Sequence, residues 1–188
     1  MPTSIEALIR RIKPHKRAKR LVRRPGKDLP YVGDNPLVGP VMLDTTVYIH
    51  VAQGKAPPAV LATLAGGGPH LHASVCLAEI AVSLGRLDPG HARTKSRSSY
   101  LTELLRKTPA HRVHAPTADD WMSAGLLAGT VARLFDAAGR DRYRLLNDCL
   151  LLFVALREGA TLLTANIRDF DPMTQIIGDA KVVFYRAA

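Results

Sequence analysis

The chain has 188 residues, 47% of them apolar, and no apolar run reaches the roughly 20 residues that cross a bilayer. These values exclude a disordered chain and a membrane-spanning protein, and they suit one domain with its own core. Two cysteines, Cys76 and Cys149, exclude a disulfide framework and favour a reducing, cytoplasmic setting.

The net charge of +10 is unevenly distributed along the chain. Residues 1–40 hold ten Lys and Arg against three acids, whereas residues 41–188 hold sixteen against thirteen. All ten cations of the first segment lie in residues 10–27, which contain no acid. We therefore divide the chain into a basic N-terminal extension, residues 1–40, and a folded domain, residues 41–188.

The basic extension has three open interpretations. Runs of Lys and Arg contact phosphates, and Arg17, Lys19 and Arg20 are the candidate RNA contacts here. The extension can instead be a solvated tail. It can also pack on the domain or on a partner, because its start, SIEALIRRI, places four aliphatic side chains on one helical face: Ile5, Leu8, Ile9 and Ile12.

Short apolar segments alternate with helical ones after residue 40. Strands are predicted at VMLD, HLHAS, RVHA, ATLLT and KVVFY. The intervening segments have helical spacing, with Ser74 and a Thr117–Asp120 capping box as start signals and Gly159 as a stop signal. Apolar strands that alternate with helices favour a parallel sheet covered by helices on both faces.

Four acids are expected at the carboxyl edge of this sheet, where such folds place their functional crevice. Asp44 ends the first strand, and Asp169 follows the fourth. Glu79 lies on the helix after the second strand, and Asp148 lies at the start of the helix that precedes the fourth. Carboxylates beside apolar runs are costly to bury unless they are paired or bind a metal. Hard oxygen ligands select Mg²⁺ or Mn²⁺.

Three of these acids also have an ordinary explanation. Asp148 suits the first turn of a helix, where the helix dipole favours an acid. Asp44 can cap the turn that follows it, and Asp169 can stabilise an Asx-type turn. Asp171 is expected to be an exposed acid, because it follows Phe170, which we expect in the core.

The chain from Val41 to Tyr185 resembles the PIN domain, in particular the VapC-like toxins of type II toxin–antitoxin pairs. The matching segments are VMLDTTVYI, HASVCLAEIAVSLGRL, NDCLLLFVALREGATLLTANIRDFD and the closing apolar strand. The resemblance implies a three-layer α/β/α sandwich with a central parallel sheet of four to five short strands. The sequence departs from the family in having Thr46 where many members have Asn, and in its long basic extension.

The resemblance also implies roles for particular residues. Family acids at the positions of Asp44, Glu79 and Asp148 bind divalent metal, and we assign the fourth position to Asp169. The supporting polar residues around these acids are Thr45, Thr46, Thr164 and Asn166. Independently of the resemblance, a cluster of arginines just before Asp148 can either guide an RNA backbone toward the acids or form a solvated loop; its members are Arg140, Arg142 and Arg144.

The function implied is a Mg²⁺- or Mn²⁺-dependent endoribonuclease that hydrolyses RNA phosphodiester bonds as the toxin of a toxin–antitoxin pair. The implied partners are an RNA substrate, a small antitoxin protein and a second copy of the chain in a homodimer, with no membrane association. Two other classes remain open. One is a nucleic-acid-binding module with an inactive or structural metal site. The other is a phosphoryl-acceptor domain of the receiver type, which is disfavoured because Lys181 precedes its strand.

Overall fold

The computed structural model describes residues 5–66, 68–135 and 142–188. This part of the chain forms one five-stranded, fully parallel sheet in the order β3-β2-β1-β4-β5. The α/β class and all five predicted strands are therefore confirmed. The strands are β1 (Val41–Leu43), β2 (His70–Ala73), β3 (Val113–His114), β4 (Thr161–Thr164) and β5 (Val182–Phe184).

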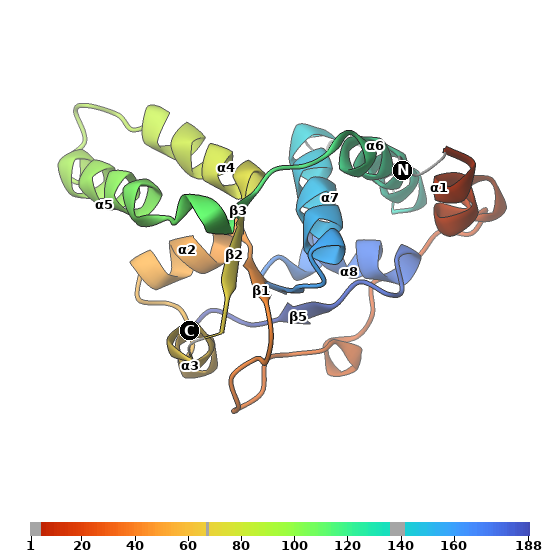
Figure 1. Cartoon of the computed structure of the whole chain (residues 1–188), viewed down its shortest axis with the longest axis horizontal. Helices are drawn as coiled ribbons and strands as arrows, with labels where there is room; N and C mark the ends of the chain where they lie inside the picture. The colour runs from red at the N-terminus through yellow and green to blue at the C-terminus, as the bar shows by residue number, and fades with distance from the viewer. Residues whose placement is uncertain (1–4, 67, 136–141) are drawn as a thin grey trace.

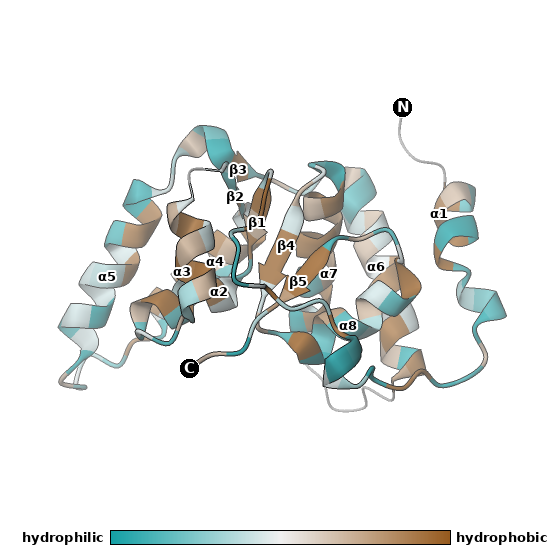
Figure 2. Ribbon diagram, turned by 90° about the horizontal axis from the view of Figure 1, so that it is seen from below, coloured by the Kyte–Doolittle hydropathy of each residue, from teal (hydrophilic) through white to brown (hydrophobic). Residues whose placement is uncertain are grey.

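Helices cover both faces of the sheet (Figures 1 and 2). Helices α2 to α5 lie on one side, and α6 to α8, with α1 outside them, lie on the other. None of the helices in the described ranges is long and apolar enough to cross a bilayer. Their bounds are α1 (Ile5–Ile12), α2 (Thr45–Ala52), α3 (Pro58–Ala65), α4 (Ser74–Gly85), α5 (Thr94–Lys107), α6 (Ala118–Leu134), α7 (Arg142–Arg157) and α8 (Ile167–Ile176).

The core is centred on β1, β4 and α7. All three residues of β1 are buried, and so are Leu162 and Leu163 of the paired β4. Residues 149–155 of α7 are all buried, which explains why this helix is apolar around its whole circumference. The sheet is thus buried on both faces, as its continuous apolar runs predicted.

The local helix signals were mostly read correctly. Asp120 accepts a hydrogen bond from the Thr117 N–H at 2.8 Å and donates its own N–H to the Thr117 hydroxyl at 3.2 Å, which confirms the capping box. Gly159 follows α7 with a left-handed φ of 62°. Ser74 was wrongly predicted to cap α4: it is the first helical residue, and its side chain makes no cap hydrogen bond.

The basic extension packs on the domain. Leu8 and Ile12 of α1 are 3% and 0% exposed, and Leu29 is 7% exposed. The Arg133 guanidinium of α6 donates to the carbonyls of Pro14 and Arg17 at 2.6 and 2.8 Å. These contacts support the packing interpretation over a solvated tail for residues 5–32.

The extension also reaches the core through Asp171, whose predicted exposure was wrong. Asp171 lies in α8 and is 0% exposed, as is Phe170, which is a core residue as predicted. Its carboxylate accepts hydrogen bonds from Arg24 Nε at 2.6 Å and from the Arg24 N–H at 3.0 Å. The sequence analysis placed Asp169 and Asp171 after the fourth strand but did not predict α8. The burial of Asp171 was therefore not predicted.

Candidate metal centre

Asp44 is placed by the end of β1, where it becomes the N-cap of α2. Its side chain is only 4% exposed. The Thr45 N–H donates to Oδ1 at 2.8 Å, and the hydroxyls of Thr46 and Thr164 donate to Oδ2 at 2.6 and 2.7 Å. The Asp44 carboxylate is therefore fixed at the carboxyl edge of the sheet by the backbone at the start of α2 and by two threonine hydroxyls.

Glu79 reaches the same edge from α4. Its Oε2 accepts a hydrogen bond from the Thr45 hydroxyl at 2.7 Å, and its Oε1 accepts one from Asn147 Nδ2 at 3.2 Å. Thr45 thus links the two acids, because its N–H donates to Asp44 and its hydroxyl donates to Glu79. Sequence reasoning missed Asn147, because an amide beside a candidate ligand on an apolar helix gives no periodic signal; only the contact between α4 and α7 reveals its role.

Asp148 approaches from α7, but its predicted place at the start of that helix was wrong. The helix begins at Arg142, so Asp148 lies within it, and the first-turn explanation of this acid does not hold. Its Oδ2 accepts a hydrogen bond from Asn166 Nδ2 at 3.2 Å. Asp148 is therefore held by the polypeptide segment that follows β4.

Asn166 and Asp169 complete this edge. Asn166 is the N-cap of α8, and its Oδ1 accepts the Asp169 N–H at 3.3 Å. Asn166 was predicted to be a neutral neighbour of the site, and it bridges Asp148 to the start of α8. Asp169 lies in the first turn of α8, so the Asx-type interaction expected near this acid belongs to Asn166 instead.

The four acids act on one another electrostatically. Burial, together with the charges of Asp44, Asp169 and Glu79, holds the pKa of Asp148 well above its usual range, and Arg144 partly offsets this. Burial also raises the pKa of Asp44, with a further contribution from Glu79, against hydrogen bonds from Thr46 and Thr164. The fold thus brings the four predicted acids to one place, where ionised carboxylates repel one another.

The donor chemistry of this cluster fits a hard divalent cation. The candidate ligand atoms described above are carboxylate oxygens, which Mg²⁺ and Mn²⁺ prefer. The hydroxyl, amide and backbone groups around them donate hydrogen bonds that orient these oxygens. Within the described residues, none of the ion pairs involves Asp44, Glu79 or Asp148. In the same ranges, no three His, Cys, Asp or Glu side chains already form a metal shell. The cluster therefore has the charge and the ligand type that a divalent cation needs, but its described side chains are not arranged in a coordination shell.

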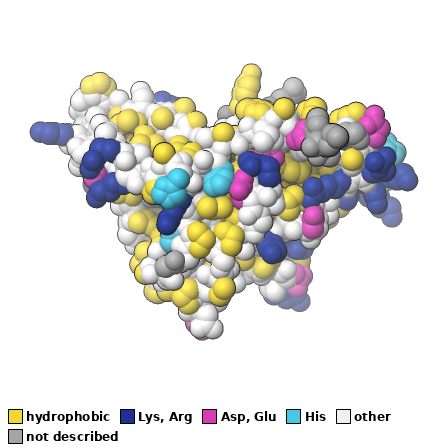
Figure 3. Space-filling model, in the orientation of Figure 1, with side chains coloured by type: hydrophobic (Ala, Val, Ile, Leu, Met, Phe, Trp, Pro, Cys, Tyr) yellow, Lys and Arg dark blue, Asp and Glu magenta, His cyan; other side chains and the backbone are white. Residues whose placement is uncertain are grey.

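The predicted RNA contacts have different positions. Arg144 is exposed on α7 and close enough to Asp148 to lower its pKa. Arg17 is used in packing, since its guanidinium donates to the carbonyls of Ile12 and Ile176. Lys19 and Arg20 are exposed. Figure 3 shows Lys and Arg side chains gathered at the right-hand side of the molecule, where α1 lies. Arg140 and the side chain of Arg142 lie outside the described residues.

Other polar candidates have structural partners. His72 Nδ1 shares a hydrogen bond with the Tyr48 hydroxyl at 2.6 Å, and burial lowers the pKa of His72 to about 4. Cys76 and Cys149 are 2% and 0% exposed, and burial raises both thiol pKa values well above the usual range. The site thus has no thiolate nucleophile at neutral pH.

Three solved structures share this fold. The VapBC2 complex of Rickettsia felis, bound to a DNA fragment from its promoter, matches 78% of this chain and 99% of its own, with 20% identity and a TM-score of 0.51. FitAB bound to an IR36 DNA fragment matches 77% of this chain and 94% of its own, with 15% identity and a TM-score of 0.52.

FitAcB from Neisseria gonorrhoeae matches 76% of this chain and 96% of its own, with 17% identity and a TM-score of 0.52. No protein-family model and no curated protein sequence matches the chain. The structural likeness shows the fold: the chain has the PIN-like α/β/α architecture that its sequence predicted.

Proposed function

We propose that this protein is a Mg²⁺- or Mn²⁺-dependent endoribonuclease and the toxin of a toxin–antitoxin pair. The observation that carries the proposal is the convergence of Asp44, Glu79, Asp148 and Asp169 at the carboxyl edge of the sheet. Burial, and after it the charges of Asp44, Asp169 and Glu79, raise the pKa of Asp148 there. No Lys or Arg in the described part of the chain forms an ion pair with Asp44, Glu79 or Asp148. Such a cluster is stable in its ionised form only with a cation.

The residues of the cluster have separate tasks in this proposal. Asp44, Glu79, Asp148 and Asp169 supply the carboxylate oxygens. Thr46 and Thr164 fix one oxygen of Asp44, which leaves Oδ1 with the Thr45 N–H as its hydrogen-bond donor. Asn147 and Asn166 hold Glu79 and Asp148 from the neighbouring helix and loop. A bound divalent cation would supply water activation and neutralise charge on the phosphoryl oxygens.

An RNA phosphodiester suits this arrangement as the substrate. The acids alone would repel a polyanion, so the metal-free protein should bind RNA more weakly than the metal-loaded protein. Arg144 stands near Asp148 as an exposed cation that can contact the phosphate backbone. The buried thiols of Cys76 and Cys149 favour attack by water over a protein nucleophile.

The partner in this proposal is a small antitoxin protein. The support is the shared fold with VapBC2, FitAB and FitAcB. We further propose a homodimer and a cytoplasmic location, as the resemblance implies.

A nucleic-acid-binding module with an inactive metal site is the second candidate. The observation that favours it is the set of exposed cations on the extension, including Lys19 and Arg20, together with the absence of a preformed metal shell in the described residues. This candidate predicts RNA binding without turnover.

Cleavage of single-stranded RNA in Mn²⁺, in Mg²⁺ and in EDTA tests the proposal. Wild type should cleave in either metal and not in EDTA, and its products should carry 5′-phosphate and 3′-hydroxyl ends. Asp148→Asn should lose cleavage, whereas the matched control Asp34→Asn, at an exposed acid outside the cluster, should retain it. Binding without cleavage in all three conditions would favour the binding module, and 2′,3′-cyclic phosphate ends would contradict the hydrolytic reaction.

A further inference from the structure

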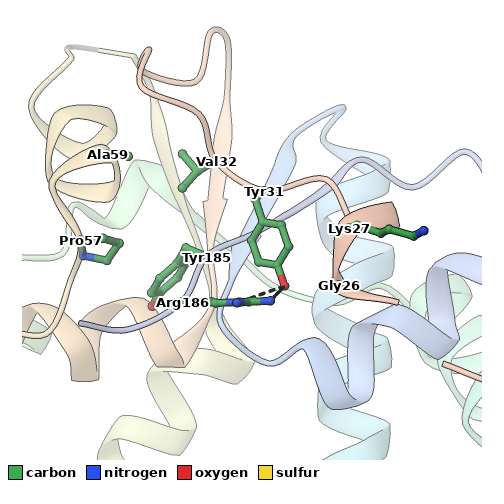
Figure 4. A pocket seen from close by; sticks show the side chains of 8 residues that line it. All are labelled: Gly26, Lys27, Tyr31, Val32, Pro57, Ala59, Tyr185 and Arg186. Atoms are coloured by element: carbon green, nitrogen blue, oxygen red, sulfur yellow. Dashed lines mark hydrogen bonds between the residues drawn. The ribbon is translucent and has the colours of Figure 1, made fainter. Parts of the chain in front are cut away.

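A cleft of about 450 Å³ lies where the extension meets the end of β5 and the start of α3. Figure 4 shows Lys27 and Tyr31 of the extension on one side of it, and Pro57, Ala59 and Tyr185 on the other. The extension pairs with β5 through one isolated parallel bridge, between Tyr31 and Phe184: the Val32 N–H donates to the Phe184 carbonyl, and the Phe184 N–H donates to the Pro30 carbonyl, both at 2.8 Å. One wall of the cleft is therefore fixed by sheet hydrogen bonds.

The cleft presents two cations and no acid among its described lining residues. Lys27 and Arg186 are both exposed. The Arg186 guanidinium donates to the Tyr31 hydroxyl from Nε at 3.3 Å and from a terminal nitrogen at 3.2 Å, and it lies 5.1 Å from the Tyr31 ring centroid. These contacts orient a planar group whose remaining N–H donors are free to bind an anion.

Gly26 lies close to Arg186. A Cβ at Gly26 would lie 2.9 Å from a terminal nitrogen of Arg186, so a larger residue would shift the end of this flexible side chain. The approach brings residues that are far apart in the sequence, 26 and 186, to one surface.

The cleft opens at the edge of the sheet that carries the acids. The Tyr185 N–H donates to the Thr164 carbonyl at 3.1 Å, and the Thr164 hydroxyl donates to Asp44 at 2.7 Å. Arg186 directly follows Tyr185, which pairs with Thr164, and Thr164 in turn bonds Asp44. The cleft and the acids thus lie at the same edge of the sheet, as a polymer substrate that reaches both would require.

We propose that this cleft binds the phosphate backbone of the RNA strand on one side of the scissile bond, through Arg186 and Lys27. The proposal rests on the proposed ribonuclease function. It assigns RNA contact in the extension to Lys27, in place of the packed Arg17. Phosphate contact explains why two exposed cations line a cleft with no acid in its described lining.

The test is RNA binding, measured by fluorescence anisotropy on the full chain with a labelled single-stranded RNA in EDTA, where no metal-dependent cleavage occurs. The variants are Arg186→Ala and Lys27→Ala. The matched control is Lys181→Ala, because Lys181 is an exposed cation just before β5, at the opposite end of the strand from Arg186. Thermal unfolding of each variant checks that the fold is intact; Lys27 is a second, independent probe should Arg186→Ala unfold.

We expect Arg186→Ala and Lys27→Ala each to raise Kd about fivefold and to lower the slope of log Kobs against log salt by about 0.7. Lys181→Ala should change neither. Binding of both variants within about twofold of the Lys181→Ala control, or no RNA binding by wild type, would overturn the proposal. If wild type cleaves RNA and the variants bind normally, only the cleft assignment fails. If wild type never cleaves and the variants bind weakly, only the nuclease proposal fails.

Discussion

Removing Arg24 tests whether the extension is an integral part of the fold. Arg24 Nε bonds Asp171 at 2.6 Å, and a terminal nitrogen of Arg24 bonds the Thr174 hydroxyl at 2.6 Å. Asp171 has a side chain that is 0% exposed, so Arg24→Ala leaves a buried carboxylate without its cation. Only the carboxylate of this pair is fully buried, since the Arg24 side chain is 35% exposed. Leaving a buried charge unpaired costs about 3–5 kcal/mol.

We expect the lower end of that range. The Arg24 N–H at 3.0 Å and Gln175 Nε2 at 3.2 Å still donate to Asp171 Oδ2 after the substitution. A loss of about 3 kcal/mol corresponds to a fall in Tm of about 6–12 °C for a chain of this length. The assay is urea unfolding followed by circular dichroism.

The matched control is Arg11→Ala. Arg11 also links the extension to the segment after α8, through Asp179 at 2.8 Å, but the two side chains are 37% and 69% exposed. Such an exposed pair contributes about 0–1 kcal/mol. Asp171→Asn in the Arg24→Ala background should restore part of the loss, because an amide is less costly to bury than an unpaired charge. Equal stabilities of Arg24→Ala and Arg11→Ala would refute this account of the extension.

Three further predictions concern the acids. In metal-free buffer at pH 7, Asp148→Asn should stabilise the protein, because the pKa of Asp148 is raised in the folded state and its ionised form opposes folding. Each unit by which the Asp148 pKa in the folded state exceeds that in the unfolded state contributes about 1.4 kcal/mol. The gain in stability should disappear as the pH falls to 3.8, the ordinary pKa of an aspartate. A gain that persists at low pH would contradict this cause. Mn²⁺ at about 100 times its Kd should stabilise wild type by about 2.7 kcal/mol, and Asp148→Asn should need more Mn²⁺ for the same rise in Tm, which thermal unfolding in a Mn²⁺ series measures. Induced expression should slow bacterial growth and Asp44→Asn should relieve this in growth curves, whereas equal growth of the two strains would argue against a toxin.

The sheet and most helices were predictable because their signals are local. Residues 41–43 and 161–164 are apolar runs bounded by turn residues, and the Thr117–Asp120 box and Gly159 mark a helix start and stop by their own backbone hydrogen bonds and torsion angles. The edge on which Asp44 lies follows from the parallel topology alone.

The missed features depend on contacts between distant segments. Asp171 reads as a surface acid until Arg24, 147 positions earlier, is seen beside it. Asn147 meets Glu79 across 68 positions, through the contact of α7 with α4. The residues of α8 include Pro172, which opposes a helix in sequence, but the N-cap by Asn166 and the burial of Phe170 stabilise it. Sequence patterns do not report such pairings.

The central claim is that the clustered carboxylates hold a divalent cation, and the anomalous difference map of a crystal grown with Mn²⁺ tests it most directly. We predict a peak between Asp44 and Asp148, about 2.0–2.3 Å from each carboxylate oxygen that binds directly and farther from one that binds through ordered water, with Glu79 and Asp169 beside it. The same map from Asp148→Asn should show a weaker peak or none. A well-ordered wild-type crystal with no anomalous density between these acids at millimolar Mn²⁺ would contradict the claim.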